Sequence, residues 1–292
     1  MKAAFVFPVA LLLLTACRDP ERVRVLTGEA MGTTYRIKYV GDAEFDVSRI
    51  EVLCDGLDRD LSTWRDDSWV SRFNAAAAGS GHEMPDSVAE LLELSSRLSE
   101  ETEGRFDPTI GALVKLWGFG PNRREGWEKP TQEEVDAALG ACGFRNLVIE
   151  GARVAKRNGD LMLDFSAIAK GYTVDRMADL FRDSGYRNFV VEFGGEIYAS
   201  GAAPGAEGWV VGGGSLESGI VLTDEAVATS GSEHQSRGFW SHIINPRTGW
   251  ALPPGEPVTV RAESCARADA LATAGFVAEA EADVTRFQEE RR

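Results

Sequence analysis

Residues 188–201 read NFVVEFGGEIYASG, two short apolar runs separated by a pair of glycines. Runs rich in β-branched and aromatic residues and bounded by glycine are typical of β-strands. Similar runs follow toward the C-terminal end, with glycine and proline between them: WVVGG, GIVL, AVATS, SHIIN and PVTVRA. The second half of the chain is therefore predicted to consist largely of strands.

The first half is richer in helical patterns. Residues 45–62 place apolar side chains on one helical stripe, and residues 87–104 and 130–143 each open on a capping box, Ser87–Glu90 and Thr131–Glu134. Residues 147–165 look like two strands around an Asn158–Gly159 turn, with another strand before them. Helices early and strands late, without regular alternation, predict an α+β fold with mostly antiparallel sheets and flanking helices. We expect one compact domain that can divide into two lobes.

The N-terminus reads as a targeting segment. Residues 1–16 carry Lys2, an apolar run and the ending LTA, and Cys17 follows. This pattern is typical of a lipoprotein signal peptide, in which the cysteine is lipidated and becomes the new N-terminus. An ordinary signal peptide with a chance cysteine is the alternative. We expect residues 17–28 to form a tether and residues 29–292 the folded domain, held at a bacterial membrane.

Composition excludes one class of partner. The net charge of the 292-residue chain is −15, and nucleic-acid binding needs basic surface. The remaining cysteines, Cys54, Cys142 and Cys265, are irregularly spaced and are expected to be buried as small apolar residues. A phosphate-bearing ligand would require a local cation, because the bulk charge would repel it.

Residues 266–274, ARADALATA, form an alanine-rich helical segment that contains Asp269 and Thr273. Four residues apart, these side chains lie on the same helical face. A carboxylate and a hydroxyl are hard oxygen ligands and suit Mg²⁺. The alternative is an exposed aspartate and a threonine hydrogen-bonded to its own helix.

Three other segments carry side chains suited to catalysis or ligand binding. Residues 163–175, LDFSAIAKGYTVD, place Lys170 at the start of a helix, where backbone N–H groups favour an anion. The alternative is a turn with a solvent-facing lysine. Residues 241–249, SHIINPRTG, place His242 at a strand end as a candidate general base, with His234 as the competitor and a core histidine as the alternative. Residues 104–120, GRFDPTIGALVKLWGFG, suit a planar ligand or a core.

These segments, in this order, resemble the ApbE family of FAD:protein FMN transferases. The resemblance runs from about residue 29 to residue 276 and includes MGTTY, LSTW with SRFN, FDPTIGALVKLWGFG, LDFSAIAKGYTVD, VEFGGEIYASG, VATSG, HIINPRTG and ADALAT. Residues 278–292 are charged, whereas family members usually continue with a further strand and helix. Many members are envelope lipoproteins, which implies a lipid-anchored protein on the periplasmic side.

The resemblance implies Mg²⁺-dependent transfer of FMN from FAD to a threonine or serine hydroxyl of a target protein, with release of AMP. The implied metal ligands are the carbonyl of Ala167 and the side chains of Asp269 and Thr273. His242, with Asp269 nearby, would accept the proton of the target hydroxyl. The implied FAD contacts are Met31, Trp64, Arg105, Phe106, Asp107, Lys170 and Ile243.

Two other functions fit the same residues. One is a Mg²⁺-dependent FAD pyrophosphatase that releases FMN and AMP, and the other is a non-catalytic flavin-binding envelope lipoprotein. For the transferase, the family analogy suggests that the target is a redox subunit of a membrane electron-transport complex.

Overall fold

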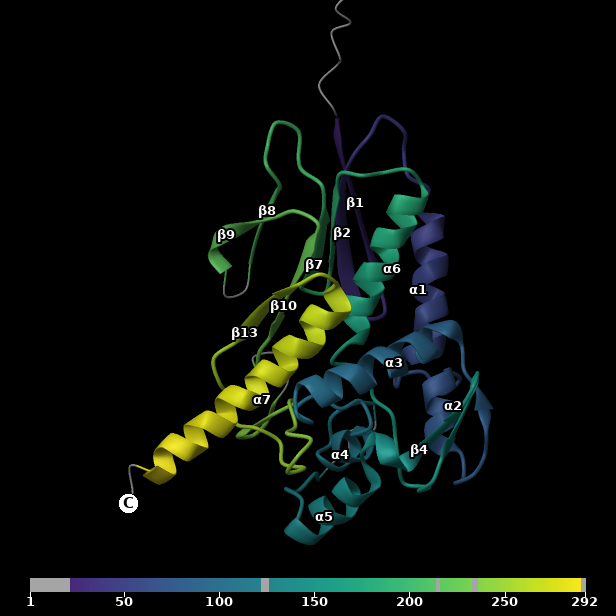
Figure 1. Ribbon diagram of the computed structural model, residues 1–292, viewed down its shortest axis with the longest axis vertical. Helices are drawn as coiled ribbons and strands as arrows, with labels where there is room; N and C mark the ends of the chain where they lie inside the picture. Colours follow the sequence, from purple (N-terminus) through teal and green to yellow (C-terminus); the bar gives the residue numbers. More distant parts are fainter. Residues whose placement is uncertain (1–21, 122–125, 214–215, 233–235, 290–292) are drawn as a thin grey trace, which may run out of the picture.

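A computed structural model of the chain describes residues 22–121, 126–213, 216–232 and 236–289 (Figure 1). Its largest element is a six-stranded sheet in the order β1-β2-β6-β7-β10-β13, and every neighbouring pair in it is antiparallel. The strands are β1 (Val23–Ala30), β2 (Thr33–Val40), β6 (Phe189–Phe193), β7 (Glu196–Ser200), β10 (Glu225–Ser230) and β13 (Val258–Ala262). The stretch NFVVEFGGEIYASG thus supplies the two central strands.

Three helices pack on one face of this sheet: α1 (Ser48–Leu61), α6 (Ala169–Asp183) and α7 (Cys265–Glu289). Their apolar stripes meet the inward side chains of the sheet, so that Ile37, Phe181 and Phe189 are fully buried together. The charged segment that follows residue 277 continues α7 as helix through Glu289. The helical layer therefore brings the alanine-rich segment directly against the sheet.

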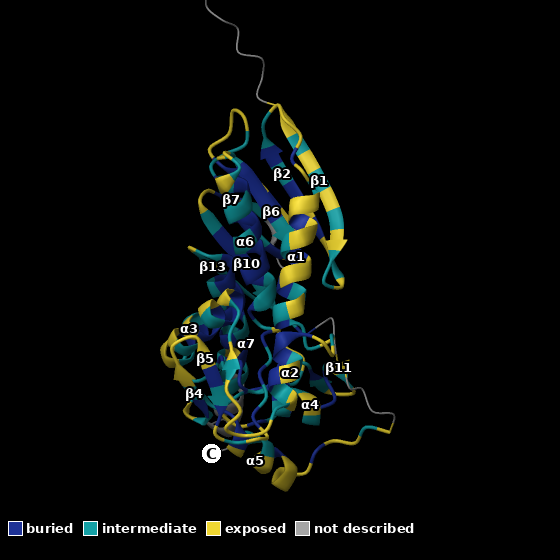
Figure 2. Ribbon diagram, turned by 90° about the vertical axis from the view of Figure 1, so that its right-hand side faces the viewer, coloured by how far each residue is buried: buried dark blue, intermediate teal, exposed yellow. Residues whose placement is uncertain are grey.

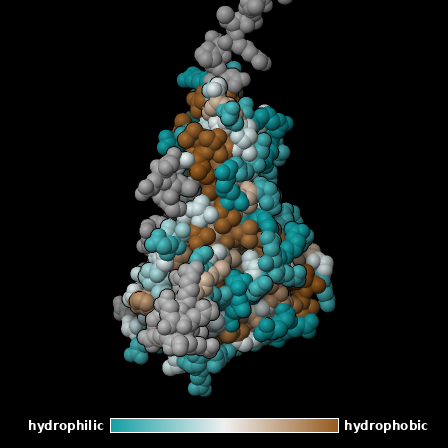
Figure 3. All heavy atoms as spheres, turned by 60° about the vertical axis from the view of Figure 1, so that its left-hand side comes forward, coloured by the Kyte–Doolittle hydropathy of each residue, from teal (hydrophilic) through white to brown (hydrophobic). Residues whose placement is uncertain are grey.

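The opposite face of the sheet carries the hairpin β8 (Trp209–Gly213) and β9 (Leu216–Leu222). Trp209 and Leu222 pack there against Val190 and Val227. Figure 3 shows apolar side chains gathered on the surface of this side of the molecule.

The remaining elements form a second region at the end of the helical layer (Figure 2). They are α2 (Trp69–Ala75), β3 (His82–Glu83), α3 (Asp86–Glu101), α4 (Gly111–Leu116), α5 (Gln132–Ala141), a 3₁₀ turn (Phe144–Asn146), β4 (Leu147–Glu150), β5 (Arg153–Lys156), β11 (Ser236–Arg237) and β12 (Trp240–Ser241). Strands β3, β5 and β4 pair in that order, and β11 pairs with β12. One continuous apolar cluster joins α2 and α3 to the ends of α1, α6 and α7.

The predicted α+β fold with antiparallel sheets is confirmed, but some local assignments are wrong. The hairpin within 147–165 turns at residues 151–152, and Met162 makes only an isolated parallel bridge to Ile110. The cause lies in Lys156, whose buried ammonium donates to the carbonyls of Asn74 (3.0 Å), Gly159 (2.9 Å) and Leu161 (3.2 Å). These bonds hold residues 157–161 as a loop.

The two predicted capping boxes and the predicted SHIIN strand have different outcomes. The Thr131–Glu134 capping box forms, whereas Ser87 donates instead to the carboxylate of Asp60 (2.6 Å) and α3 begins before it. In SHIIN only Ser241 lies in a strand, and Ile244 makes an isolated bridge.

The predicted lipid anchor stays a prediction. The targeting segment and Cys17 lie outside the described residues. Within the described part of the chain, no helix is long and apolar enough to cross a membrane.

Candidate functional site

The junction between α6 and α7 contains the carboxylate of Asp269, which is 4% exposed. Its Oδ2 accepts a hydrogen bond from the backbone N–H of Gly171 (3.0 Å). In an uninterrupted helix that N–H would bond to the carbonyl of Ala167, four residues earlier. Among the described residues, no hydrogen bond ends on the Ala167 carbonyl or on Asp269 Oδ1. Two oxygen atoms at this junction are therefore available to a ligand.

The close approach of the two helices has a specific cause. The carboxylate of Asp175, on α6, accepts the backbone N–H groups of Cys265 (2.7 Å) and Ala266 (2.8 Å) at the start of α7. A carboxylate at a helix N-terminus satisfies free donors and favours the helix dipole. Three alanines of α7 are buried in the core on one face of the helix: Ala266, Ala270 and Ala274. The alanine-rich segment packs closely, as its sequence predicts.

Thr273 lies one turn beyond Asp269, and its Oγ1 hydrogen-bonds to Oγ of Ser230 (2.9 Å) at the end of β10. The threonine is thus tied to the sheet rather than to its own helix. No cluster of three or more His, Cys, Asp or Glu side chains in the described ranges is placed to hold a metal. The predicted ligand set contains a single carboxylate, so this finding does not test it.

Charged side chains gather beside Asp269. Lys170 forms an ion pair with Oε1 of Glu196, whose side chain is 2% exposed. Burial and the neighbouring charge of Asp269 raise the pKa of the Glu196 carboxyl, whereas the paired ammonium of Lys170 lowers it and favours the charged form. Burial also raises the pKa of Asp269. Burial also keeps the pKa of the Cys265 thiol well above its usual value, so this thiol stays neutral. Sequence reasoning missed Glu196, although the two glycines before it mark a tight turn.

Met31 reaches the same region from the β1–β2 turn. Its backbone φ is 48°, and its Sδ accepts a weak hydrogen bond from Oγ1 of Thr173 (3.8 Å) in the first turns of α6. The structure therefore brings the predicted residues Met31, Lys170 and Asp269 to one end of the α6–α7 pair.

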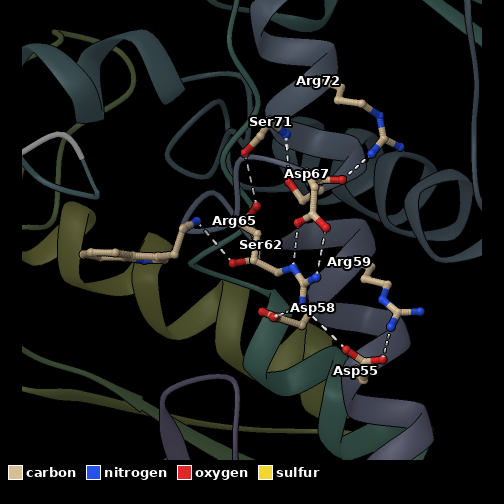
Figure 4. A network of polar contacts seen from close by, with 10 residues as sticks. Asp55, Asp58, Arg59, Ser62, Arg65, Asp67, Ser71 and Arg72 are labelled. Carbon is tan, nitrogen blue, oxygen red and sulfur yellow. Dashed lines mark hydrogen bonds and ion pairs between the residues drawn. The ribbon is translucent and has the colours of Figure 1, made fainter.

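Trp64 lies in the connection between α1 and α2 and is 60% exposed. Figure 4 shows the polar network around this connection. Arg65 is its centre and pairs with Asp67 (3.0 Å) and Asp58 (3.2 Å). An exposed indole on a fixed connection suits stacking against a planar ligand.

Arg105 does not point freely toward a ligand, because its Nε donates to Oε2 of Glu281 (2.9 Å) near the end of α7. Phe106 is buried in the core, 2% exposed. Asp107 accepts the N–H of Thr109 (2.8 Å), and burial raises the pKa of its carboxyl. The side chains of Arg105, Phe106 and Asp107 thus all have protein contacts, and their predicted role toward FAD stays a prediction.

His242 follows β12, and its ring lies edge-on to Phe119, with 6.5 Å between ring centres. Ile243 is buried against Phe276 of α7. Phe119 also lines a cavity of about 270 Å³, together with Thr63, Asp66 and Asp164. This cavity joins segments that sequence reasoning treated separately. His234, the competing base, lies outside the described residues.

The described residues therefore supply oxygen donors and a lysine where the start of α6 meets α7, and a histidine whose loop contacts the same helix α7 further along, at Phe276 and Glu281. The oxygen donors come from the α6 start and from α7, while Phe276 and Glu281 extend α7 toward the loop of His242. Such a set suits chemistry at a phosphate bound near a metal ion.

Comparison with known proteins gives a consistent result. The profile of the ApbE family matches residues 31–292. A curated FAD:protein FMN transferase of Vibrio cholerae is 37% identical over 281 residues, which cover 90% of this chain and 84% of that protein. A protein of the same name from Haemophilus influenzae is 32% identical over 291 residues, covering 91% and 84%.

Solved structures match as well. The apo flavinyl transferase ApbE of Pseudomonas stutzeri superposes with a TM-score of 0.81 at 38% identity, over 88% of this chain and 85% of that one. The flavin transferase ApbE of Vibrio cholerae gives 0.78 at 35% identity, over 88% and 87%.

Proposed function

This chain belongs to the ApbE family as an enzyme that transfers FMN from FAD to protein, and we propose that the α6–α7 junction performs the transfer with Mg²⁺. The observation that carries the proposal is the pair of unused oxygens, the Ala167 carbonyl and Asp269 Oδ1, beside the hydroxyl of Thr273. All three are hard donors of the kind that Mg²⁺ prefers.

The fit of these residues to Mg²⁺ rests on burial and chemistry. Asp269 is almost fully buried in a chain of net charge −15. Burying a carboxylate raises its pKa and costs free energy unless a cation compensates it. When bound, Mg²⁺ supplies positive charge that stabilises the pyrophosphate oxygens of FAD in the transition state. Asp269, Thr273 and the Ala167 carbonyl would hold it.

The chain's own groups supply the remaining steps. In the proposed reaction the oxygen of a threonine or serine hydroxyl of the target attacks the phosphorus on the FMN side, and the bond to AMP breaks. His242 accepts the hydroxyl proton, and Lys170 stabilises negative charge on the phosphate oxygens. The exposed ring of Trp64 and the side chain of Met31 contact FAD. Asp269 acts beside His242 as part of the catalytic set.

The target and the location are also part of the proposal. The target would be a redox subunit of a membrane electron-transport complex. The lipobox-like ending before Cys17 supports a lipid anchor on the periplasmic side of the bacterial envelope. Cell fractionation tests the anchor: the chain should occur with membranes, and a Cys17→Ser variant should not. Equal membrane association of both would argue against this anchor.

The transfer is tested with the full chain, FAD, Mg²⁺ and the flavin-carrying redox subunit of the same organism. Intact-protein mass spectrometry of the acceptor should show an added mass equal to FMN less water, and EDTA should abolish it. FMN and AMP released with the acceptor unmodified would instead indicate the pyrophosphatase. Bound, unchanged FAD would indicate the flavin-storing lipoprotein.

The metal ligands are tested separately. Asp269→Asn keeps the size of the side chain but removes its charge, and we expect it to abolish the Mg²⁺ dependence together with the activity. Glu279→Gln, an exposed position on the same helix, is the matched control and should behave as the wild type. An unchanged Mg²⁺ titration in Asp269→Asn would refute the ligand assignment.

A further inference from the structure

Glu196 is a buried acid of the site that lies in the segment VEFGGEIYASG, and the proposed reaction gives it no role. Its side chain is 2% exposed, and one oxygen, Oε1, pairs with the ammonium of Lys170. The other oxygen, Oε2, is buried and accepts no hydrogen bond from the described residues. Burying a carboxylate with one oxygen unpartnered costs free energy, so this glutamate calls for an explanation beyond packing.

The backbone fixes the direction of this side chain. Gly194 and Gly195, with φ of 59° and 104°, form the two-residue turn between β6 and β7. Positive φ at both positions is the requirement of a type I′ hairpin turn, which glycine meets without strain. Glu196 stands directly opposite Phe193, which is buried under the helices. Side chains of opposed residues share a face of the sheet, so Glu196 points toward α6 and α7.

Lys170 has two buried carboxylates within electrostatic reach and pairs with only one. Burial lowers its pKa, but the charges of Asp269 and Glu196 raise it further, so the ammonium stays charged. In the described part of the chain its only ion pair within 4.0 Å is with Glu196. Asp269 accepts the N–H of Gly171 instead. The ammonium is therefore held to the glutamate, and Asp269 keeps an unused oxygen.

We propose that Glu196 is a positioning residue that holds the Lys170 ammonium away from Asp269 and so leaves Asp269 available to a divalent cation. This inference rests on the proposed function, in which Asp269 is a metal ligand. Without the negative charge of Glu196, Asp269 is the remaining buried carboxylate near the lysine, and the two attract each other strongly at low dielectric. An ammonium that occupies Asp269 competes with the cation for the same oxygens.

The test measures the binding of Mg²⁺ alone to the full chain by titration calorimetry, without FAD. We expect Glu196→Gln to weaken Mg²⁺ binding by about tenfold or more, because one uncompensated charge acts at short range. Glu192→Gln, at a half-buried carboxylate of the same hairpin that accepts the N–H of Gly195, keeps an acceptor oxygen and should bind like the wild type. Equal affinity of Glu196→Gln and the wild type would overturn the proposal.

A double variant separates competition from simple damage to the site. Removing the lysine as well, in Glu196→Gln/Lys170→Met, should restore Mg²⁺ affinity, because no ammonium remains to compete. If the double variant binds as weakly as Glu196→Gln, the loss is structural and the proposal is wrong. If Glu196→Gln does not fold, Lys170→Met alone decides: it should bind Mg²⁺ at least as tightly as the wild type, and weaker binding overturns the proposal.

Failure of the proposed function gives a different result. If the wild type and Asp269→Asn show the same absence of Mg²⁺ binding, the metal assignment itself is wrong, and the role of Glu196 falls with it. If the wild type binds Mg²⁺, Asp269→Asn does not and Glu196→Gln equals the wild type, only the role of Glu196 is wrong.

Discussion

Gly171 lies so close to Cys265 that a Cβ atom on the glycine would come within 2.3 Å of the cysteine carbonyl oxygen. The contact joins the first turn of α6 to the first residue of α7. A backbone atom cannot move aside as a side chain can. The glycine therefore sets the distance between the helix that carries Lys170 and the helix that carries Asp269.

We expect Gly171→Ala to push the two helices apart and to destabilise the protein by about 2–3 kcal/mol, as overpacking does in closely packed cores. Urea unfolding measures the change. The matched control is Gly56→Ala in α1, where an added Cβ meets nothing within 4 Å. Because alanine favours helix, this control should stabilise by about 1 kcal/mol. Equal stability of Gly171→Ala and the wild type would show that the helices separate without cost.

Asp175 makes the second connection between these helices, as the acceptor of two N–H groups at the start of α7. Asn at this position keeps one acceptor but turns an NH₂ group toward a backbone donor. We expect Asp175→Asn to lower the free energy of unfolding by about 1–2 kcal/mol, the usual value of a lost helix cap. Asp183→Asn, at an exposed position of the same helix, should change it by less than about 0.5 kcal/mol. A similar effect of both would contradict the capping role.

Sequence patterns predicted the fold because they report which face of an element is apolar. The apolar runs in residues 188–201 and the alanines of residues 266–274 each indicate buried side chains, and the structure buries both. The segment LDFSAIAKGYTVD also placed Lys170 at the start of a helix, and α6 begins at Ala169. Local signals failed where a side chain offered a competing partner, as when the Lys156 ammonium donates to the carbonyls of Gly159 and Leu161 at the expected Asn158–Gly159 turn.

Partners across long sequence separations could not be predicted from one sequence. Asp175 looks like one more polar residue on α6, yet it caps a helix 90 residues away. Glu196 follows a glycine turn whose register decides which face it occupies, and only the three-dimensional packing shows Lys170 beside it. Glu281 belongs to a charged segment without an apolar pattern and still contacts Arg105, 176 residues away.

The role of His242 predicts a loss of transfer without loss of FAD binding. We expect His242→Ala to slow transfer by about 10²–10⁴-fold, the usual contribution of one general base. Flavin fluorescence should show nearly unchanged FAD affinity, because the imidazole acts on the target hydroxyl and not on the flavin. Transfer at the wild-type rate would assign the role of general base to another group, and His234 would be the first candidate.

We expect Trp64 to contribute to FAD binding and not to the stability of the fold. Its side chain is 60% exposed, so removal leaves no cavity in the core. We expect Trp64→Ala to weaken FAD binding by about tenfold, equivalent to about 1.4 kcal/mol of lost stacking. Urea unfolding should be unchanged. Val52→Ala, an exposed apolar position on α1, is the control and should alter neither quantity. Unchanged FAD affinity in Trp64→Ala would remove Trp64 from the flavin site.

Glu281 should make part of the free energy of unfolding depend on pH in the acid range. Burial raises the pKa of its carboxyl, but hydrogen bonds from Asn245 and Arg105 and the charge of Arg247 lower it more, so the pKa falls below the usual value. The unfolded chain then binds this proton more readily than the folded one. The contribution of Glu281 is therefore complete above the unfolded-state pKa and is lost as the pH falls through the folded-state pKa.

We expect Glu281→Gln to cost about 1 kcal/mol near neutral pH, a value typical of a small charge network. The cost should be smaller in acid, below the folded-state pKa of the carboxyl, than at neutral pH, because the wild-type carboxylate is then protonated as well. Urea unfolding at both pH values measures it, and Glu279→Gln, which is exposed on the same helix, should show no difference at either. A cost that is equal at both pH values would mean that the carboxylate acts through shape and not through charge. The loop of His242 would then be held against α7 by packing alone, through Ile243 and Phe276.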